Sequence, residues 1–321
     1  NSNLAGHDSH GVLRIPQYAK MIEEKRIVPG APIEVERDTP TMTVLNGHWG
    51  FGQFIAKRAF DIAIDKARTA AISCVAAHNC NHVGRVGEYT EMVAAQGMIG
   101  IAMVNNHGGG QVMCPHGGTA KRLSPNPISV AFPTGASDPI LLDITSSVVA
   151  EGKLRVKRNR GEKIPLGWVT DAQGRPTTDP NDFYKDPPGA ILPFGGMAAH
   201  KGFGLAFVID VLCGTLSGAG CSRPGIPHPA NGLFGIVIDI QKFLPLTDFR
   251  RQVDALIQHV KSSPLAPGFT EILVPGEPEH RERQKRLKEG IFVEDETWRQ
   301  IVDVATKTGL KGVLPKCSRR V

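Results

Sequence analysis

Hydrophobic residues recur along this chain with two different spacings, which predict helices and strands in alternation. In residues 53–71 they return every three or four positions, as on one face of a helix. The apolar run 72–77 follows directly and predicts a buried strand. Residues 88–96 and 99–104 repeat this order, so we expect an α/β fold.

Further elements are predicted in the second half of the chain. Short apolar runs between turn-forming residues predict strands at 128–132, 140–142 and 233–240. We expect a helix over 145–158 with Thr145 as its cap, and a long apolar helix that contains glycines over 200–217.

The last part of the chain is richer in charge and helical periodicity. Residues 277–289 predict a highly charged helix, and residues 296–308 predict an amphipathic one. We therefore expect a discontinuous helical domain, formed by residues 1–40 and 279–321. Residues 41–278 would form an α/β body that binds cofactor and substrate.

Composition supports a globular enzyme without a nucleic-acid partner. The chain has 321 residues, of which 41% are hydrophobic and 21% charged, so it can bury a sizeable core. The net charge of +6 could favour nucleic acid, but acidic residues are interleaved with the basic ones. The basic run 153–160 lacks the aromatic residues that stack on bases, and it predicts a solvated helix face or a contact to a cofactor phosphate.

The cysteines and the apolar stretches bear on the compartment. Six cysteines are scattered without the pattern of a secreted disulfide framework, so reduced thiols and a cytoplasmic location are expected. Neither a run of 18 apolar residues nor an export signal is seen, and we expect no membrane association. The chain begins at Asn1, close to a motif, so an N-terminal segment is expected to be missing.

Several nucleotide-binding and hydrolytic motifs have no match. A G-x-G-x-x-G loop is absent, which argues against a standard Rossmann site, and so is the P-loop pattern. Residues 107–110 (His-Gly-Gly-Gly) are similar to the oxyanion strip of esterases. The G-x-S-x-G nucleophile elbow is missing, however, so acyl hydrolysis is not favoured.

A cluster of possible metal ligands comprises His78, Cys80 and His82, with Cys114 and His116 further along. Imidazole and thiolate suit zinc, but this spacing matches no zinc pattern. A continuing strand would place the first three side chains on one face, and a loop is an equally good prediction. We favour a polar strand end with one catalytic histidine and no metal.

Another group of polar residues lies close to the N-terminus. If Ser9 or Asp8 caps a helix there, His10 and Arg14 lie one turn apart on the same face. Arginine can hold a carboxylate by two parallel hydrogen bonds, and histidine can donate to a neighbouring carbonyl oxygen. The pair therefore suits a 2-oxo acid. A helix cap with a surface pair is the alternative.

Taken together, segments along nearly the whole chain resemble the type-2 malate/L-lactate dehydrogenase family, most closely its hydroxycarboxylate dehydrogenase branch. The matching segments, in order, are residues 3–11, 81–87, 126–127, 143–146, 152–153, 174–180, 200–202 and 275–277. The resemblance implies a non-Rossmann, mixed-sheet α/β fold similar to sulfolactate dehydrogenase. It also implies a homodimer with active sites near the domain and subunit boundaries.

The resemblance further implies a nicotinamide cofactor, with NADH preferred and NADPH possible. The residues that match the family's cofactor contacts are Asn126, Asp143, Thr145, Ser146, His200, Lys201, Gly276 and Glu277. Hydroxyl groups and a lysine can bind phosphate, and helix N-termini favour anions, so these residue types suit the role.

The same resemblance implies the reaction, which interconverts small 2-oxo acids and 2-hydroxy acids. The acid/base residue is the histidine at His82 or at His10, with His82 preferred, because an imidazole titrates near neutrality. Arg14 would hold the substrate carboxylate, and Ser9 and Asn105 would donate further hydrogen bonds. The alternatives are a cyclic imine reductase of the same family and a nicotinamide-binding regulatory module.

Overall fold

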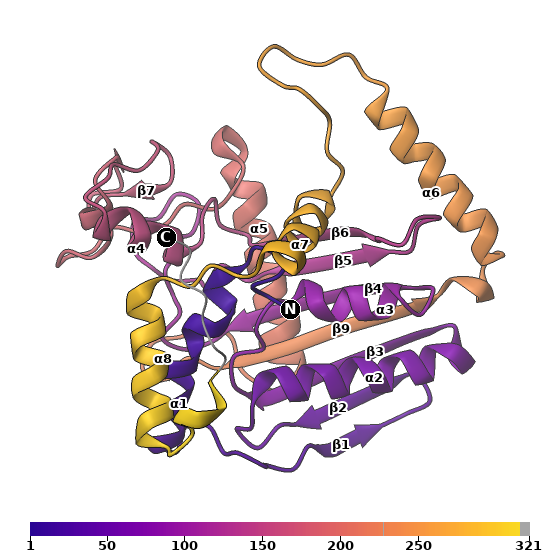
Figure 1. Ribbon diagram of the computed structural model, residues 1–321, viewed down its shortest axis with the longest axis horizontal. Coiled ribbons are helices and arrows are strands. Elements are labelled where there is room, and N and C mark those ends of the chain that lie inside the picture. Colours follow the sequence, from indigo (N-terminus) through magenta and orange to yellow (C-terminus); the bar gives the residue numbers. More distant parts are fainter. Residues whose placement is uncertain (227, 315–321) are drawn as a thin grey trace.

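A seven-stranded mixed sheet forms the centre of the computed structural model, which describes residues 1–226 and 228–314 (Figure 1). Its strand order is β1-β2-β3-β9-β4-β5-β6. The strands are β1 (Glu34–Asp38), β2 (Met42–Asn46), β3 (Ile72–Cys80), β4 (Met98–Asn106), β5 (Ile128–Phe132), β6 (Ile140–Ile144) and β9 (Asn231–Asp239). β2 and β3 run parallel, and the other neighbours are antiparallel. The predicted α/β class with a mixed sheet is confirmed.

Helices cover both faces of this sheet. α2 and α3 lie on one face and α5 lies on the other (Figure 1). The helices are α1 (Ile15–Glu23), α2 (Gly52–Ala70), α3 (Gly87–Ala94), α4 (Glu151–Asn159), α5 (Ala199–Asp210), α6 (Leu246–Lys261), α7 (Glu277–Glu289) and α8 (Asp295–Lys307). α5 continues into a π-helical segment, Val211–Leu216.

The main core lies between α2 and the central strands. The apolar stripe that predicted α2 is buried there, and it includes Ile55, Ala59 and Ala63. Phe60 packs directly on β9, because a side-chain carbon at Gly235 would lie 2.5 Å from the Phe60 ring. The missing side chain at Gly235 therefore sets how closely α2 approaches the sheet.

A smaller lobe stands beside the ends of β4, β5 and β6. It contains α4, the strand pair β7 (Val169–Thr170) and β8 (Pro176–Thr177), and the short helix Pro180–Phe183. Leu154, Ile191 and Phe183 form part of its own apolar core. This lobe supplies one wall of the cavity described below.

Two predictions about helix starts are wrong. The helix expected from Thr145 begins only at Glu151, because Thr145 Oγ1 donates to the Ser147 carbonyl instead of capping a helix. Near the N-terminus, two short 3-10 helices, Asp8–His10 and Val12–Arg14, replace the expected continuous helix. Neither Asp8 nor Ser9 caps a helix.

The N-terminal and C-terminal regions meet at one side of the molecule. α1 packs against α8 (Figure 1). The range 1–40 also contains β1, which pairs with β2 in the sheet. Residues 1–40 therefore supply both a helix next to α8 and an edge strand.

One helical stretch among the described residues, Gly196–Leu216, is long and apolar enough by length and composition to cross a membrane. Its inner side packs on the sheet through Ile209 and Cys213, both of which are fully buried. Its outer side exposes the apolar residues Phe207, Val208, Val211 and Leu216. The stretch therefore has an apolar face that no described residue covers.

Candidate active site

A cavity of about 600 Å³ brings together the N-terminal segment, the loop after β3, the end of β4 and the start of α4. The chemically active side chains that line it are His7, Ser9, His10, Arg14, His82, Arg85, Asn106, Lys121, Asp143, Thr145 and Arg155. The four residues predicted to bind and protonate the substrate, Ser9, His10, Arg14 and His82, are therefore in one place.

The N-terminal segment is fixed in position by side-chain contacts. Asn3 Oδ1 accepts from the Val12 amide at 2.8 Å, and a side-chain carbon at Gly11 would lie 2.0 Å from that oxygen. Arg286 of α7 donates to the Asn3 carbonyl and to the Asp8 carboxylate. Because Asp8 is engaged by Arg286, it is unavailable as a helix cap. The contacts of Asn3 and Arg286 therefore hold Ser9 and His10 at the cavity.

His82 lies in a loop that begins where β3 ends at Cys80. Asn81 anchors the loop, since its Nδ2 donates to the carbonyls of Trp49 and Gly50 at 2.6 and 3.1 Å. The N-terminus of α2 abuts the same loop, because a side-chain carbon at Gly52 would lie 2.0 Å from the Asn81 carbonyl oxygen. Glycine is therefore required at position 52 for this loop and α2 to meet.

The two candidate acid/base histidines stack on each other. The ring centroids of His10 and His82 are 5.3 Å apart, with an interplanar angle of 20°. Ser9 Oγ lies 2.9 Å from His10 Nδ1, and Tyr18 Oη lies 2.6 Å from His82 Nδ1. Since each Nδ1 has a protein partner, each Nε2 is the nitrogen left for a substrate.

Burial depresses the basicity of both rings. Desolvation, followed by the positive charge of Arg14, lowers the pKa of His82 to about 3. Desolvation and then Arg14 also lower the pKa of His10 to about 4. Both imidazoles are therefore neutral at pH 7 in the protein alone. An anion beside Arg14 would offset part of this effect and raise both pKa values.

Two hydrogen bonds hold the Arg14 guanidinium at the cavity. Its Nε donates to the Ser9 carbonyl at 2.7 Å, and its Nη1 donates to Gln17 Oε1 at 2.7 Å. Arg14 is half-buried, and this burial lowers the pKa of its guanidinium. Among the described residues it forms no ion pair, so its remaining N–H groups can bind a substrate carboxylate.

Asn105 cannot act as the expected substrate donor. Its Nδ2 donates to Asp210 Oδ1 at 2.8 Å and to the Gly220 carbonyl at 3.1 Å. Its Oδ1 accepts from the Gly232 amide at 2.9 Å. Because both ends of the amide are bonded within the protein, Asn105 joins β4 to the end of α5, to the loop at Gly220 and to β9, and it does not serve the substrate.

Asp143 is committed to a buried charge network. Its Oδ2 accepts from the Gly87 amide at 3.0 Å and lies 3.4 Å from Arg85 Nε. Arg85 also donates from Nη1 to Glu91 at 2.8 Å, and its side chain is 1% exposed. Desolvation raises the pKa of Asp143, and Arg85 opposes that shift. The carboxylate thus neutralises Arg85 at the cavity wall.

The cavity suits a nicotinamide ring and its carboxamide. Asn106 lines the cavity, and its buried Oδ1 has no hydrogen-bond partner among the described residues, so it can accept from an amide N–H. Thr145 and Ser124 add hydroxyl groups, while Pro125 and Ile144 add apolar surface. Asp143 and Thr145 are the two predicted cofactor residues that lie here.

The other predicted cofactor residues lie elsewhere. Asn126 and Ser146 are fully buried behind the wall, and Asn126 Nδ2 donates to the Ala206 carbonyl at 2.9 Å. His200 is exposed, with its ring 5.8 Å from that of His116, and Lys201 is exposed beside it. Gly276 immediately precedes α7, and Glu277, the first residue of that helix, pairs with Lys261 and Arg281.

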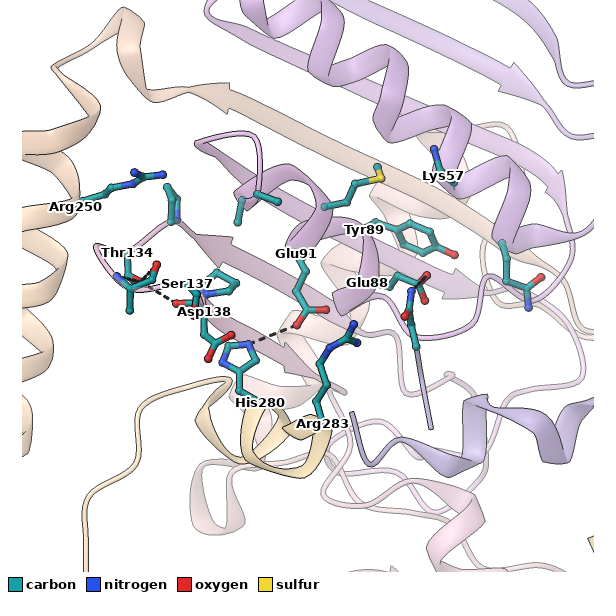
Figure 2. A pocket seen from close by; sticks show the side chains of 18 of the residues that line it. Lys57, Glu88, Tyr89, Glu91, Thr134, Ser137, Asp138, Arg250, His280 and Arg283 are labelled. Atoms are coloured by element: carbon teal, nitrogen blue, oxygen red, sulfur yellow. Dashed lines mark hydrogen bonds and ion pairs between the residues drawn. The ribbon is translucent and has the colours of Figure 1, made fainter. Parts of the chain in front are cut away.

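A second cavity, of about 840 Å³, lies between α2, α3, the β5–β6 turn and α7 (Figure 2). Figure 2 shows Glu91 of α3 and His280 of α7 pointing toward one another, at a distance of 3.6 Å. Glu91 also binds Arg85, so the Arg85 network separates the two cavities. His10, Arg14 and His82 line only the smaller one.

The possible metal ligands are dispersed. His78 Nε2 binds Glu36 at 2.8 Å on the surface, Cys80 is buried under the sheet, and His82 faces the cavity. In the part of the chain that the structure describes, no group of three metal-binding side chains comes together.

Several residues of the cavity region were missed from the sequence. Tyr18 follows Arg14 by four positions, so the spacing of one helical turn could have identified it. Gln53, whose Nε2 donates to Tyr18 Oη at 2.8 Å, gave no comparable signal. Lys121 and Arg155 also line the cavity. Arg155 lies in the basic run 153–160, for which the sequence left a contact to a cofactor phosphate open, whereas Lys121 gave no such signal.

Comparisons with known proteins show the family to which the chain belongs. The sequence model of the malate/L-lactate dehydrogenase family matches residues 1–302. The chain is 36% identical to malate dehydrogenase of Pyrococcus horikoshii over 97% of this chain and 87% of that protein. It is 37% identical to L-sulfolactate dehydrogenase of Methanocaldococcus jannaschii, over 97% of this chain and 88% of that protein.

Solved structures give the same result. The sulfolactate dehydrogenase of M. jannaschii superposes with a TM-score of 0.85 at 36% identity, covering 96% of this chain and 88% of that one. The resemblance inferred from the motifs is therefore confirmed. The chain belongs to the malate/L-lactate dehydrogenase family, and it is a nicotinamide-dependent oxidoreductase that interconverts 2-oxo acids and 2-hydroxy acids.

Proposed function

We propose that His82 is the acid/base residue of this dehydrogenase and that Arg14 binds the substrate carboxylate. The observation that carries this assignment is the contact between His82 Nδ1 and Tyr18 Oη at 2.6 Å. It fixes the ring so that Nε2 is the nitrogen available to the substrate, in the same cavity as Arg14.

The roles follow from the charges in the cavity. Binding of the substrate carboxylate offsets the positive charge of Arg14, and this raises the pKa of His82 so that the ring can carry a proton. The nicotinamide cofactor supplies a hydride to the carbonyl carbon when it is bound. His82 gives its proton from Nε2 to the carbonyl oxygen, which becomes the hydroxyl group. In the oxidative direction His82 removes that proton.

Ser9 and His10 assist catalysis by His82, and His10 is the other ring of the stacked histidine pair. The Ser9 hydroxyl orients the His10 ring through Nδ1. His10 can then donate a hydrogen bond from Nε2 to the substrate, while His82 transfers the proton. Arg14 Nε donates to the Ser9 carbonyl, so the Ser9–His10 pair is joined directly to the residue that binds the substrate carboxylate.

NADH is the proposed cofactor. The support for NADH over NADPH is the resemblance to the hydroxycarboxylate branch. The test is a panel of 2-oxo acids with NADH and with NADPH, in which initial rates are compared. We expect oxidation of NADH with 2-oxo acids, and a tenfold preference for NADPH would overturn the assignment.

A cyclic imine reductase is the second candidate. A solved structure of delta1-piperideine-2-carboxylate reductase from Pseudomonas syringae has a TM-score of 0.81 and 27% identity, covering 95% of this chain and 89% of that one. Adding cyclic imine carboxylates to the panel decides between the two reactions. A nicotinamide-binding module without catalysis would oxidise no cofactor with any substrate in the panel.

The enzyme is further proposed to be a cytoplasmic homodimer. The exposed apolar face of α5 and the π-helical segment, formed by Phe207, Val208 and Val211, requires a covering surface, and a second copy of this face can provide one. Gly204 lies on the same side with open space above it, so it would let two helices approach closely. The free thiols of the described cysteines suit a reducing compartment.

A further inference from the structure

The active-site cavity holds a second positive charge that the mechanism above does not use. Lys121 comes from the loop that precedes β5, and it lines the same cavity as Arg14. Its Nζ donates to the Phe183 carbonyl at 2.9 Å and lies 3.5 Å from the centroid of the Phe183 ring. Phe183 is 3% exposed, so its carbonyl and its ring hold the Lys121 ammonium group in a fixed position.

The charges around Lys121 do not balance. Glu151 lies within electrostatic range of Arg14 and of Lys121. It is already bound by Arg155 Nη2 at 2.7 Å and by the Tyr184 hydroxyl at 2.7 Å. Arg14, Lys121 and Arg155 therefore share the single carboxylate of Glu151. Two of these three positive charges are left without a paired anion among the residues that the structure describes. On the other wall, Arg85 already has two carboxylate partners, Asp143 and Glu91.

Arg14 and Lys121, the two cations that form no ion pair within the described part of the chain, are both partly removed from water. Burial is the main cause that lowers the pKa of Arg14 and that of Lys121. Among the described residues neither side chain forms an ion pair. Two desolvated cations in one cavity are unfavourable unless anions join them. One anion is the 2-oxo acid carboxylate at Arg14, which leaves Lys121 without an anionic partner among the described residues.

We propose that Lys121 is a specificity-determining residue that binds a second anionic group, at the end of the substrate opposite the carboxylate held by Arg14. This inference rests on the proposed function of the cavity. It assigns the enzyme to substrates with two acidic groups, in preference to those with an alkyl side chain of similar size. The contacts to Phe183 leave Lys121 further N–H groups for that anion.

Two substrates of equal carbon number test this role. Oxaloacetate carries a second carboxylate, and 2-oxobutanoate carries a methyl group in its place. The variants are Lys121→Met, which removes the charge but keeps an apolar stem against Phe183, and Lys121→Arg, which keeps the charge. Arg122→Met is the matched control, since Arg122 is the neighbouring cation, exposed and outside the cavity.

The ratio of kcat/KM for oxaloacetate to kcat/KM for 2-oxobutanoate should fall by roughly ten- to a hundredfold in Lys121→Met, the usual effect of one lost hydrogen bond to a charged group. Lys121→Arg should retain most of the ratio, and Arg122→Met should retain all of it. The NADH dissociation constant should not change. An unchanged ratio, or an equal loss with both substrates, would overturn the proposal.

A binding experiment separates this inference from the proposed function. Thermal stabilisation by succinate and by butyrate is measured in the wild type and in Lys121→Met, with NADH present. Stabilisation by succinate that is lost in the variant supports Lys121 as the second anion site, even if neither oxo acid is reduced. A lower NADH affinity with no change in either ligand's effect would assign Lys121 to a cofactor phosphate and overturn the proposal.

Discussion

Tyr18 Oη lies 2.6 Å from His82 Nδ1, although the two residues are 64 positions apart in the chain. Gln53 donates to the same hydroxyl oxygen at 2.8 Å. When His82 is protonated, its Nδ1 must donate, and the Tyr18 oxygen is the acceptor in place. The contact therefore stabilises the charged form of a ring whose burial disfavours that form.

Replacement of Tyr18 by Phe should remove this acceptor with little change in volume. We expect kcat to fall about tenfold, because the protonated state of His82 becomes harder to reach. The pKa on the acidic side of the pH–rate profile should move to lower pH, since the charged imidazole loses a partner. Steady-state rates from pH 5 to 9 measure both effects, and an unchanged profile would contradict this role.

His82→Ala should lower turnover by roughly a hundredfold or more, the scale of general acid catalysis. NADH binding should be retained, as judged by fluorescence titration. His10→Ala should have a smaller effect on turnover and a larger effect on KM, because His10 is assigned to substrate binding. If His10→Ala is inactive while His82→Ala turns over normally, the two roles must be exchanged.

Stability should depend on pH through the two buried histidines. The pKa of His82 is lowered to about 3 and that of His10 to about 4, whereas both lie near 6.5 in the unfolded chain. Below pH 6.5 the unfolded state therefore binds more protons, and the free energy of unfolding falls as pH drops from about 6.5 toward 4. The loss should be about 2 kcal/mol or more at pH 4.

Urea unfolding at several pH values measures this dependence. The double variant His10→Asn, His82→Asn serves as the comparison, because it lacks both titrating rings. Its free energy of unfolding should vary less between pH 6.5 and pH 4 than that of the wild type. Identical slopes in the two proteins would show that other groups control the acid sensitivity.

Arg14→Lys keeps the positive charge but loses the planar fork, so it tests geometry. The specificity constant for 2-oxo acids should fall by roughly ten- to a hundredfold, as expected for one charged hydrogen bond. NADH affinity should stay nearly constant. A normal specificity constant, or an equal loss of NADH affinity, would remove Arg14 from the substrate site.

Substitution of Val208 by Asp should disrupt the proposed dimer, since it buries a charge in an apolar contact. Val208 is 53% exposed in the single chain, so the monomer fold should tolerate the change. Sedimentation equilibrium gives the mass of both proteins. Arg251→Asp, on an exposed helix away from α5, controls for added negative charge. A wild type that is monomeric would refute the proposal.

The sequence predicted most elements because their apolar periodicity reflects burial on one face. The strand predicted at 128–132 is β5, and the helix predicted at 277–289 is α7. The helix expected from Thr145 was wrong, because hydroxyl residues can bond locally to their own backbone instead of capping a helix. The spacing of apolar residues does not show whether a hydroxyl side chain will bond to its own backbone or cap a helix.

The candidate site was only partly predictable for a related reason. His10 and Arg14 lie close together in the sequence, so local spacing could suggest a shared role. Tyr18, Gln53 and Lys121 acquire their roles from partners 35 or more positions away. Asn105 has a residue type that suits substrate binding, but its distant partners use all of its amide hydrogen bonds.

The position of β9 has a consequence for the order in which the chain acquires structure during synthesis. β9 lies between β3 and β4 and pairs with both, yet its residues follow those of β4 by well over a hundred positions. As the chain leaves the ribosome, β3 and β4 emerge early with unpaired edges facing the gap that β9 will fill. The sheet can close only after Asp239 has emerged, so the early strands need protection from aggregation until then.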